Sequence, residues 1–149
     1  MSNENNPPMS LMLEIFALDR EPVRLEVADV ALPGVEGVFT VLPGHAPMVA
    51  AIAIGVLTAT MRSGIRHSFA VSGGLAHVAR DRVTVLTQTA EMDVEIDLER
   101  AEEARTWAER ELARAQGTAD VGFVEVALKR AITRIRARHG ESAGLPPVF

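Results

Sequence analysis

The sequence predicts an α+β fold, in which a β-sandwich or barrel of about eight to ten strands precedes an antiparallel two-helix hairpin. Three observations predict it. From Leu11 to Thr89, short runs rich in Val, Ile, Leu and Thr recur roughly every ten residues between Gly, Pro and charged turns. From Asp93 onward, proline is absent until Pro146, alanine and charge dominate, and apolar residues recur at spacings of three and four. A Gly-Thr-Ala-Asp stretch at 117–120 divides this second part in two.

The strands of the first part, residues 11–92, are expected where apolar and polar residues alternate. The expected segments are 12–17, 23–32, 38–41, 48–52, 56–61, 66–71, 75–79 and 82–86. In the second of these, Val23, Leu25 and Val27 alternate with charged residues, but the apolar phase then moves to Val30 and Leu32. Such a change of phase predicts a β-bulge or a bend at this point.

Short turns at 62–64, 73–74 and 80–81 are expected to close hairpins, because each joins two alternating segments at hairpin length. Gly73 and Gly74 in the stretch VSGGLA also suggest a phosphate-binding loop. However, no Gly-Lys-Ser/Thr follows, and the next element is a strand instead of a helix. The glycine pair is therefore interpreted as a hairpin turn.

The second part, residues 93–139, is expected to form two helices. Asp97 can cap the first, from 98 to about 116, and the 117–120 stretch ends it and starts a second helix from about 121 to 138. The apolar stripe of the first comprises Ala101, Ala104, Ala108, Leu112 and Ala115, and that of the second Val124, Ala127, Ala131 and Ile135, widened by Leu128 and Ile132. An antiparallel hairpin follows from these facing stripes.

This hairpin is expected to be weakly held, because alanine buries little apolar area at roughly 25 cal/mol per Å². Its charges are also segregated: residues 93–111 carry eight acids and three bases, whereas residues 129–139 carry five bases and no acid. Two interpretations stay open at this point. The charged faces attract each other within the hairpin, or the basic face binds an anionic partner.

Composition excludes several classes of protein. The 149 residues carry a net charge of −5, which argues against a general nucleic-acid-binding protein, and the absence of cysteine excludes disulfides and thiolate zinc sites. No apolar run reaches the roughly 18 residues that a membrane-spanning helix requires. The polar start, residues 1–10, has no features of a signal peptide and is expected to be a disordered lead of a cytoplasmic bacterial protein, and residues 140–149 to be a flexible tail.

His45, between two prolines in the stretch VLPGHAPM, is the first candidate for chemistry. A general base needs an orienting partner, and residues 41–51 offer no Asp, Glu, Ser, Cys or Lys, although Asp29 or Glu36 could approach it in the fold. The four histidines are also far apart in the sequence and lack the paired spacing of a metal site. No catalytic residue and no metal site are therefore assigned. Arg130 and Arg134 are more informative, since two arginines four residues apart share a helix face and suit an anionic ligand.

The order and spacing of three motifs identify a family resemblance. The motifs are LPGHAP, then VSGG, then VTVLTQTAE, and with the flanking stretch LPGVEGVFT they closely resemble the ε subunit of F-type ATP synthases over about residues 11–139. The resemblance implies a noncatalytic central-stalk subunit, whose sandwich binds the γ subunit and the membrane-embedded c-ring. It implies no required cofactor and a peripheral location on the cytoplasmic face of the bacterial plasma membrane.

The resemblance also implies which loop contacts the c-ring and γ. The expected contact residues are Glu36, Val38, Pro43, Gly44, His45, Ala46 and Pro47. The two prolines are expected to fix a loop that presents His45 outward. Many relatives have an acidic residue where this chain has Val38, so a contact made through charge is expected either to be weaker or to move to Glu36.

A further resemblance concerns nucleotide binding, since some bacterial ε subunits bind ATP as a regulatory ligand between the folded-down helices. The matching positions are Glu91, Ile96, Asp97, Arg100, Ala101, Arg130 and Arg134. Acidic groups would accept hydrogen bonds from ribose or adenine, and the arginines would surround the phosphates. The alternative is that Asp97 only caps its helix and the arginines pair with the acidic first helix.

The expected mechanism is a switch between two positions of the hairpin. When the hairpin lies on the sandwich, its arginines pair with the acidic first helix or with ATP. When the hairpin is extended, its basic face contacts the α/β catalytic ring and blocks ATP hydrolysis. This inhibitory face comprises Lys129, Arg130, Arg134, Arg136 and Arg138. Two rivals are a stand-alone enzyme and a free nucleotide-sensing module outside any ATPase.

Overall fold

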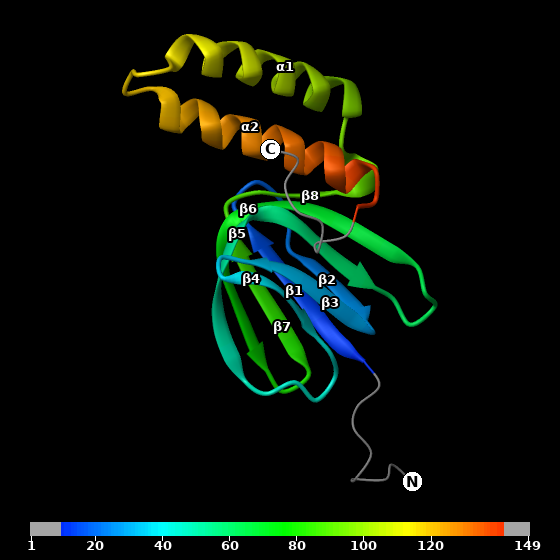
Figure 1. The fold of residues 1–149 in the computed structure, drawn as a ribbon. Coiled ribbons are helices and arrows are strands. Elements are labelled where there is room, and N and C mark those ends of the chain that lie inside the picture. Colours follow the sequence, from blue (N-terminus) through cyan, green and yellow to red (C-terminus); the bar gives the residue numbers. More distant parts are fainter. Residues whose placement is uncertain (1–9, 142–149) are drawn as a thin grey trace, which may run out of the picture.

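The computed structural model describes residues 10–141, which form a β-sandwich with two helices stacked above one end (Figure 1). The strands are β1 Leu11–Ala17, β2 Val23–Val27, β3 Asp29–Gly34, β4 Gly37–Val41, β5 Met48–Thr60, β6 Arg66–Ala79, β7 Arg82–Thr87 and β8 Ala90–Met92. A 3₁₀ turn, η1 Asp93–Glu95, leads into α1 Leu98–Ala115 and α2 Val121–Arg138. The predicted fold class is confirmed. The expected lead and tail lie, except for Ser10, Gly140 and Glu141, outside the described residues.

The strands pair in the order β2-β1-β7-β6-β5-β3-β4, with β8 attached to β6. All pairs are antiparallel except β1 with β7. The long hairpin of β5 and β6 belongs to both layers of the sandwich, because β6 pairs with β8 through Phe69–Val71 and with β7 through Gly74–Ala79. The two layers are thus joined by continuous strands.

The main hydrophobic core lies between the two layers and is built only from residues of β1–β8. Its largest fully buried side chains are Phe69, Leu11, Leu13, Ile15, Leu32 and Leu57. The helices form two separate clusters among the described residues. One, of Val56, Ala70, Ile96 and Ala137, joins α2 to the sandwich; the other, of Ala108, Ala115 and Val124, joins α1 to α2.

Four expectations for the strands are corrected, whereas the bend predicted within 23–32 is confirmed at Ala28. The segment 23–32 is two strands, since the chain bends at Ala28, whose N–H donates to the carbonyl of Thr60 at 2.6 Å, and β2 and β3 pair with different neighbours. The segments 48–52 and 56–61 are one strand, β5, and 66–71 and 75–79 are one strand, β6. The short strand β8 was not expected at all, because three residues are too few to show alternation.

The expected hairpin turn at Gly73 and Gly74 is wrong. Both glycines lie inside β6, and the register between β5 and β6 stays constant from Met48–Val78 to Thr60–Arg66. Their φ angles are +94° and +143°. A Cβ on Gly74 would lie 1.8 Å from the carbonyl oxygen of Leu86, so glycine is required by the close approach of another strand.

Gly74→Ala is therefore expected to cost about 3 kcal/mol of unfolding free energy, through positive φ and the clash with β7. The measurement is urea denaturation followed by circular dichroism. Gly122→Ala is the matched control, because Gly122 lies in α2 and a Cβ there meets nothing within 4 Å. That control should leave stability unchanged or raise it by up to about 1 kcal/mol. Equal midpoints for both variants would contradict the assigned role of Gly74.

Both helices begin and end close to where the sequence predicts. The Asp97 side chain caps α1, accepting a hydrogen bond from the Arg100 backbone N–H at 3.2 Å. Asp120 occupies the corresponding position of α2 but its side chain makes no capping bond. The buried positions of α1 are Ala101, Ala108 and Ala115, as the alanine stripe predicts. Helix α2 packs against β5, β6 and β8, and α1 lies on the outer side of α2 (Figure 1).

Candidate functional site

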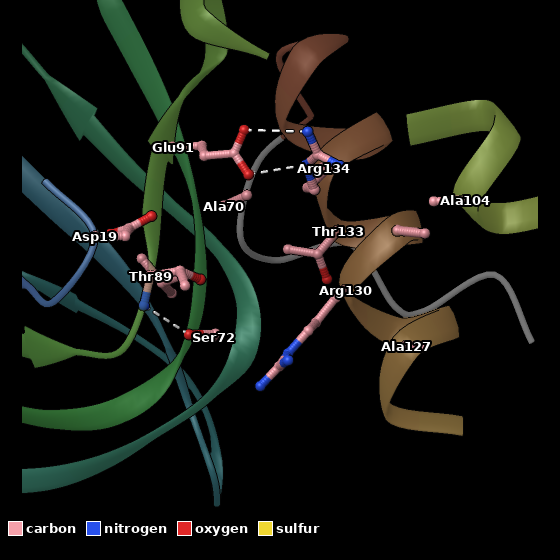
Figure 2. Close-up of a pocket in the computed structure, with 12 residues that line it drawn as sticks. Asp19, Ala70, Ser72, Thr89, Glu91, Ala104, Ala127, Arg130, Thr133 and Arg134 are labelled. Carbon is pink, nitrogen blue, oxygen red and sulfur yellow. Dashed lines mark hydrogen bonds and ion pairs between the residues drawn. The ribbon is translucent and has the colours of Figure 1, made fainter. Parts of the chain in front are cut away.

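A cavity of about 320 Å³ lies between the sandwich and α2, close to where β8 leads into the helices (Figure 2). Its walls come from the β1–β2 turn, β6, the start of β8, α2 and one residue of α1. The lining residues are Asp19, Ala70, Val71, Ser72, Thr89, Glu91, Ala104, Ala127, Arg130, Ala131, Thr133 and Arg134. This volume is at the lower end of the range for small-molecule sites.

An ion pair between Glu91 on β8 and Arg134 on α2 closes one end of the cavity. Nε of Arg134 lies 2.9 Å from Oε1 of Glu91, and Nη2 donates a hydrogen bond to Oε2 at 3.2 Å. The Nε–H itself is buried and makes no hydrogen bond of good geometry within residues 10–141. The pair is about two-thirds buried, so it ties α2 to the sandwich with one guanidinium donor still unsatisfied.

Arg130 lies one turn earlier on the same face of α2. Figure 2 shows its side chain extended along the cavity, pointing away from Glu91. Within the described part of the chain it makes no ion pair or side-chain hydrogen bond. An exposed guanidinium beside a cavity that already contains a second arginine is suited to an anionic ligand with several oxygen atoms.

The remaining residues predicted for a nucleotide site have structural roles in this conformation. Asp97 is the N-cap of α1, Ile96 is buried in the cluster with Val56 and Ala137, and Ala101 is buried against α2. None of these, nor the exposed Arg100, lines the cavity with Glu91, Arg130 and Arg134. The structure therefore brings together three of the seven predicted residues.

The sequence analysis missed the polar residues that complete the cavity. Ser72 accepts a hydrogen bond at its Oγ from the Thr89 N–H at 2.9 Å, and Asp19 accepts one from the Ala90 N–H at 3.4 Å. Thr133 is buried and donates to the Lys129 carbonyl. These residues lie on three elements far apart in sequence, so no local spacing could have identified them.

The segment between β8 and α1 is held by the β1–β2 turn. Arg20 donates from Nη1 to Oε2 of Glu95 at 2.6 Å and from Nη2 to Oε1 at 3.1 Å, and it also reaches the carbonyl of Ala90. Glu95 accepts a further bond from the Met92 N–H. The hydrogen bond from Arg20 holds the pKa of Glu95 below its ordinary value of 4.5, against the opposing effect of burial.

Stability should depend on this carboxylate at acid pH. A lowered folded-state pKa contributes stability that is complete above 4.5 and lost as pH falls through the folded pKa. Arg20→Ala is therefore expected to lose less unfolding free energy than the parent chain between about pH 6 and about pH 3. Urea midpoints at several pH values measure this, with the exposed Arg62→Ala as control. Parallel pH curves for parent and Arg20→Ala would contradict it.

The LPGHAP loop lies between β4 and β5, at the end of the sandwich away from the helices (Figure 1). The His45 N–H donates to the carbonyl of Leu42 at 3.1 Å, and Gly44 has φ +83°, so Leu42 to His45 form a tight turn with Pro43 and Gly44 at its centre. The His45 ring is half-buried and its Nδ1 lies 2.7 Å from the carbonyl oxygen of Ala46. A tight turn thus lies at the expected position, with Pro47 exposed beside it, and its role in contacts stays a prediction.

The other residues predicted for the same contact lie elsewhere on the sandwich. Glu36 is in the β3–β4 turn and Val38 is on β4. Both line a hollow beside Met48 and Val49, and Val38 also lines a groove against α2. Neither of these two hollows is lined by a residue of the 43–47 loop.

The predicted basic face of α2 is turned largely toward the sandwich. Arg130 and Arg134 line the cavity, and Lys129 and Arg136 line the groove beside β3 and β4, while Arg138 is exposed. The expectation that the acidic first helix holds these arginines is wrong. Arg134 pairs with Glu91 on the sandwich, and Arg136 pairs with Glu141 at 3.0 Å.

Three acids of α1, Glu102, Glu109 and Glu111, instead pair within their own helix. Arg105 lies near Glu102 and Glu109, and Arg114 lies 3.1 Å from Glu111. For the described residues, no ion pair joins α1 to α2. Apolar contacts between small side chains therefore hold the two helices together.

Neither helix of the described region is apolar enough over its length to cross a bilayer. Across residues 10–141, no group of three or more His, Asp or Glu side chains is arranged to bind a metal ion.

The two parts of the chain match known sequence families. Residues 10–93 match the β-sandwich domain of the ATP synthase delta/epsilon chain, and residues 95–138 match its long α-helix domain. The chain belongs to the ATP synthase delta/epsilon chain family. The resemblance inferred from the LPGHAP, VSGG and VTVLTQTAE motifs is thus confirmed.

Individual relatives agree with the family. The ATP synthase epsilon chain of Moorella thermoacetica is 41% identical over 128 residues, covering 86% of this chain and 96% of the relative. The chloroplastic ATP synthase epsilon chain of Pinus thunbergii is 38% identical over 140 residues, covering 94% and 98%. Among solved structures, a chain in the Euglena gracilis mitochondrial ATP synthase OSCP/F1/c-ring structure matches with a TM-score of 0.73 and 29% identity, over 85% of this chain and 80% of that one. This ε chain is therefore a central-stalk subunit of an ATP synthase and not its catalytic subunit.

Proposed function

We propose that this ε chain couples the γ subunit to the c-ring through its sandwich and restrains ATP hydrolysis through its two helices. The c-ring and γ contact would use the 43–47 loop, with Glu36 and Val38 at a separate position. Peripheral association on the cytoplasmic face of a bacterial membrane follows from this role. The separation of the helices from the main core supports a mobile hairpin, because its buried apolar contact with the sandwich is a cluster of four small or medium side chains beside the Glu91–Arg134 ion pair.

The position of the basic residues of α2 supports the proposed inhibition of ATP hydrolysis. Arg134 and Arg136 are largely covered where α2 meets the sandwich, and Lys129 and Arg130 line hollows there. If the hairpin leaves the sandwich, these cations together with Arg138 become available to an acidic surface of the α/β catalytic ring. The down position would then be the released state of the enzyme and the extended position the inhibited state.

ATP is proposed as a regulatory ligand of the down position, with no required cofactor. Arg130 and Arg134 would bind phosphate oxygens in the cavity, and Glu91 would accept a hydrogen bond from the ribose or the base. A ligand that binds only one state stabilises it by RT ln(1 + [L]/Kd), which is about 4 kcal/mol at a thousandfold excess over Kd. The involvement of Ile96, Asp97, Arg100 and Ala101 requires α1 to shift, since these residues do not line the cavity in this conformation.

Copurification with a γ subunit tests the assembly directly. A chain that binds γ in solution supports the central-stalk role, whereas ATP binding without γ binding would favour a free nucleotide-sensing module. Removing the helices tests the inhibitory role.

A further inference from the structure

A second hollow, the β3–α2 groove, lies where α2 meets β3, the β3–β4 turn and β5, and measures about 450 Å³. Its floor is largely apolar, with Pro33, Val38, Ile54 and Ile132 among the lining residues. Lys129 and Arg136 lie along its α2 side. Val38 is 47% exposed, which is high for a valine that faces a groove between two packed elements.

The end of α2 lies beside this groove. The N–H groups of His139, Gly140 and Glu141 donate to carbonyls of Ile135, Ala137 and Arg136 at 3.0–3.1 Å, and Gly140 has φ +72°. This C-cap reverses the chain. The Glu141 carboxylate then lies 3.0 Å from Nε of Arg136, a residue that itself lines the groove.

We propose that residues 142–149, with the sequence SAGLPPVF, bind in the β3–α2 groove of their own chain. Eight extended residues span up to about 26 Å, whereas Lys129 and Arg136 are only about 10 Å apart along α2. Leu145, Val148 and Phe149 supply apolar side chains for the floor. The adjacent prolines Pro146 and Pro147 favour an extended backbone and bring no N–H group that burial would leave unsatisfied.

Such binding would join α2 to β3 and β4 and oppose release of the hairpin. Its site differs from the proposed nucleotide site, because the cavity with Glu91 is lined by β6 and β8, whereas the β3–α2 groove is lined by β3, β4 and β5. The proposed occupant lies beyond the match to the family's helical domain, which stops at residue 138.

Disulfide trapping tests the proposal, since the chain has no cysteine of its own. Under mild oxidation, the full chain with Val38→Cys and Val148→Cys should form an intramolecular disulfide at least about tenfold faster than one with Leu75→Cys and Val148→Cys. Leu75 is the matched control because it is 49% exposed, close to the 47% of Val38, but lies on β6 outside the groove. Adding Glu141→Gln to the first pair should slow trapping, because the ion pair that directs the chain is lost.

Two results would overturn the proposal. Equal trapping rates for the Val38 and Leu75 pairs would mean that the segment does not prefer the groove. Disulfide-linked dimers from the Val38 pair, without the intramolecular product, would mean that a second copy of the chain occupies it.

Discussion

Ending the chain at Met92 is expected to raise ATP hydrolysis by the rebuilt ATP synthase at least about fivefold while ATP synthesis is retained, since coupling between sites is typically about 1–3 kcal/mol. The sandwich should survive this truncation. Every residue of its main core lies on β1–β8, and β8 itself is kept. The cut removes all five basic residues proposed to contact the catalytic ring.

A reversible version of the same experiment separates the position of the helices from their presence. Val56 and Ala137 pack in one small cluster between β5 and α2, so cysteines at both positions can lock the hairpin down. Oxidised, this variant should hydrolyse ATP as fast as the truncated chain; reduced, it should return to the level of the parent. Equal hydrolysis in the oxidised and reduced states would contradict an inhibitory role for the released hairpin.

The sequence predicted the helices better than the strands, and the difference has a physical cause. Each helix repeats its apolar positions over 18 residues, and Asp97 supplies a cap that the structure retains. In β5 and β6, glycine marked the expected ends of strands. In the structure, Gly55 and Gly74 lie inside strands. Glycine is required at these positions because Pro33 and the Leu86 carbonyl approach the backbone too closely for a side chain. Because these neighbours belong to other strands, the sequence around each glycine does not predict the close contact.

The candidate site could be predicted only in part, for a similar reason. Arg130 and Arg134 were identified by their spacing on one helix, which the sequence contains. The partner of Arg134 is 43 residues away, and that of Arg20 is 75 residues away. Family resemblance supplied Glu91, but it did not indicate that Glu91 and Arg134 pair with each other. The acidic first helix is nearer in sequence, yet Glu102, Glu109 and Glu111 pair with arginines three or four residues away on the same helix.

Replacing Arg130 and Arg134 together by alanine is expected to weaken ATP binding by about a hundredfold, since each lost charge-assisted hydrogen bond costs about 1.5–3 kcal/mol. Calorimetric titration of the isolated full chain measures this. Arg110→Ala is the control, because Arg110 is exposed on α1 and does not line the cavity. Equal heats for the parent and the double variant would remove the proposed site.

The single variant Arg130→Ala shows whether the double variant binds ATP more weakly because a ligand contact is lost or because α2 no longer lies on the sandwich. Removing Arg134 also breaks its ion pair with Glu91, so weaker binding could follow from a hairpin that no longer lies on the sandwich. Arg130 has no ion pair or side-chain hydrogen bond with any residue of 10–141, and its substitution should leave the unfolding midpoint of the free chain unchanged. An affinity loss of about tenfold at constant stability, from one charge-assisted contact, would then come from the ligand itself. A chain that loses stability but keeps its affinity for ATP would show instead that Arg130 holds the helix and does not bind phosphate.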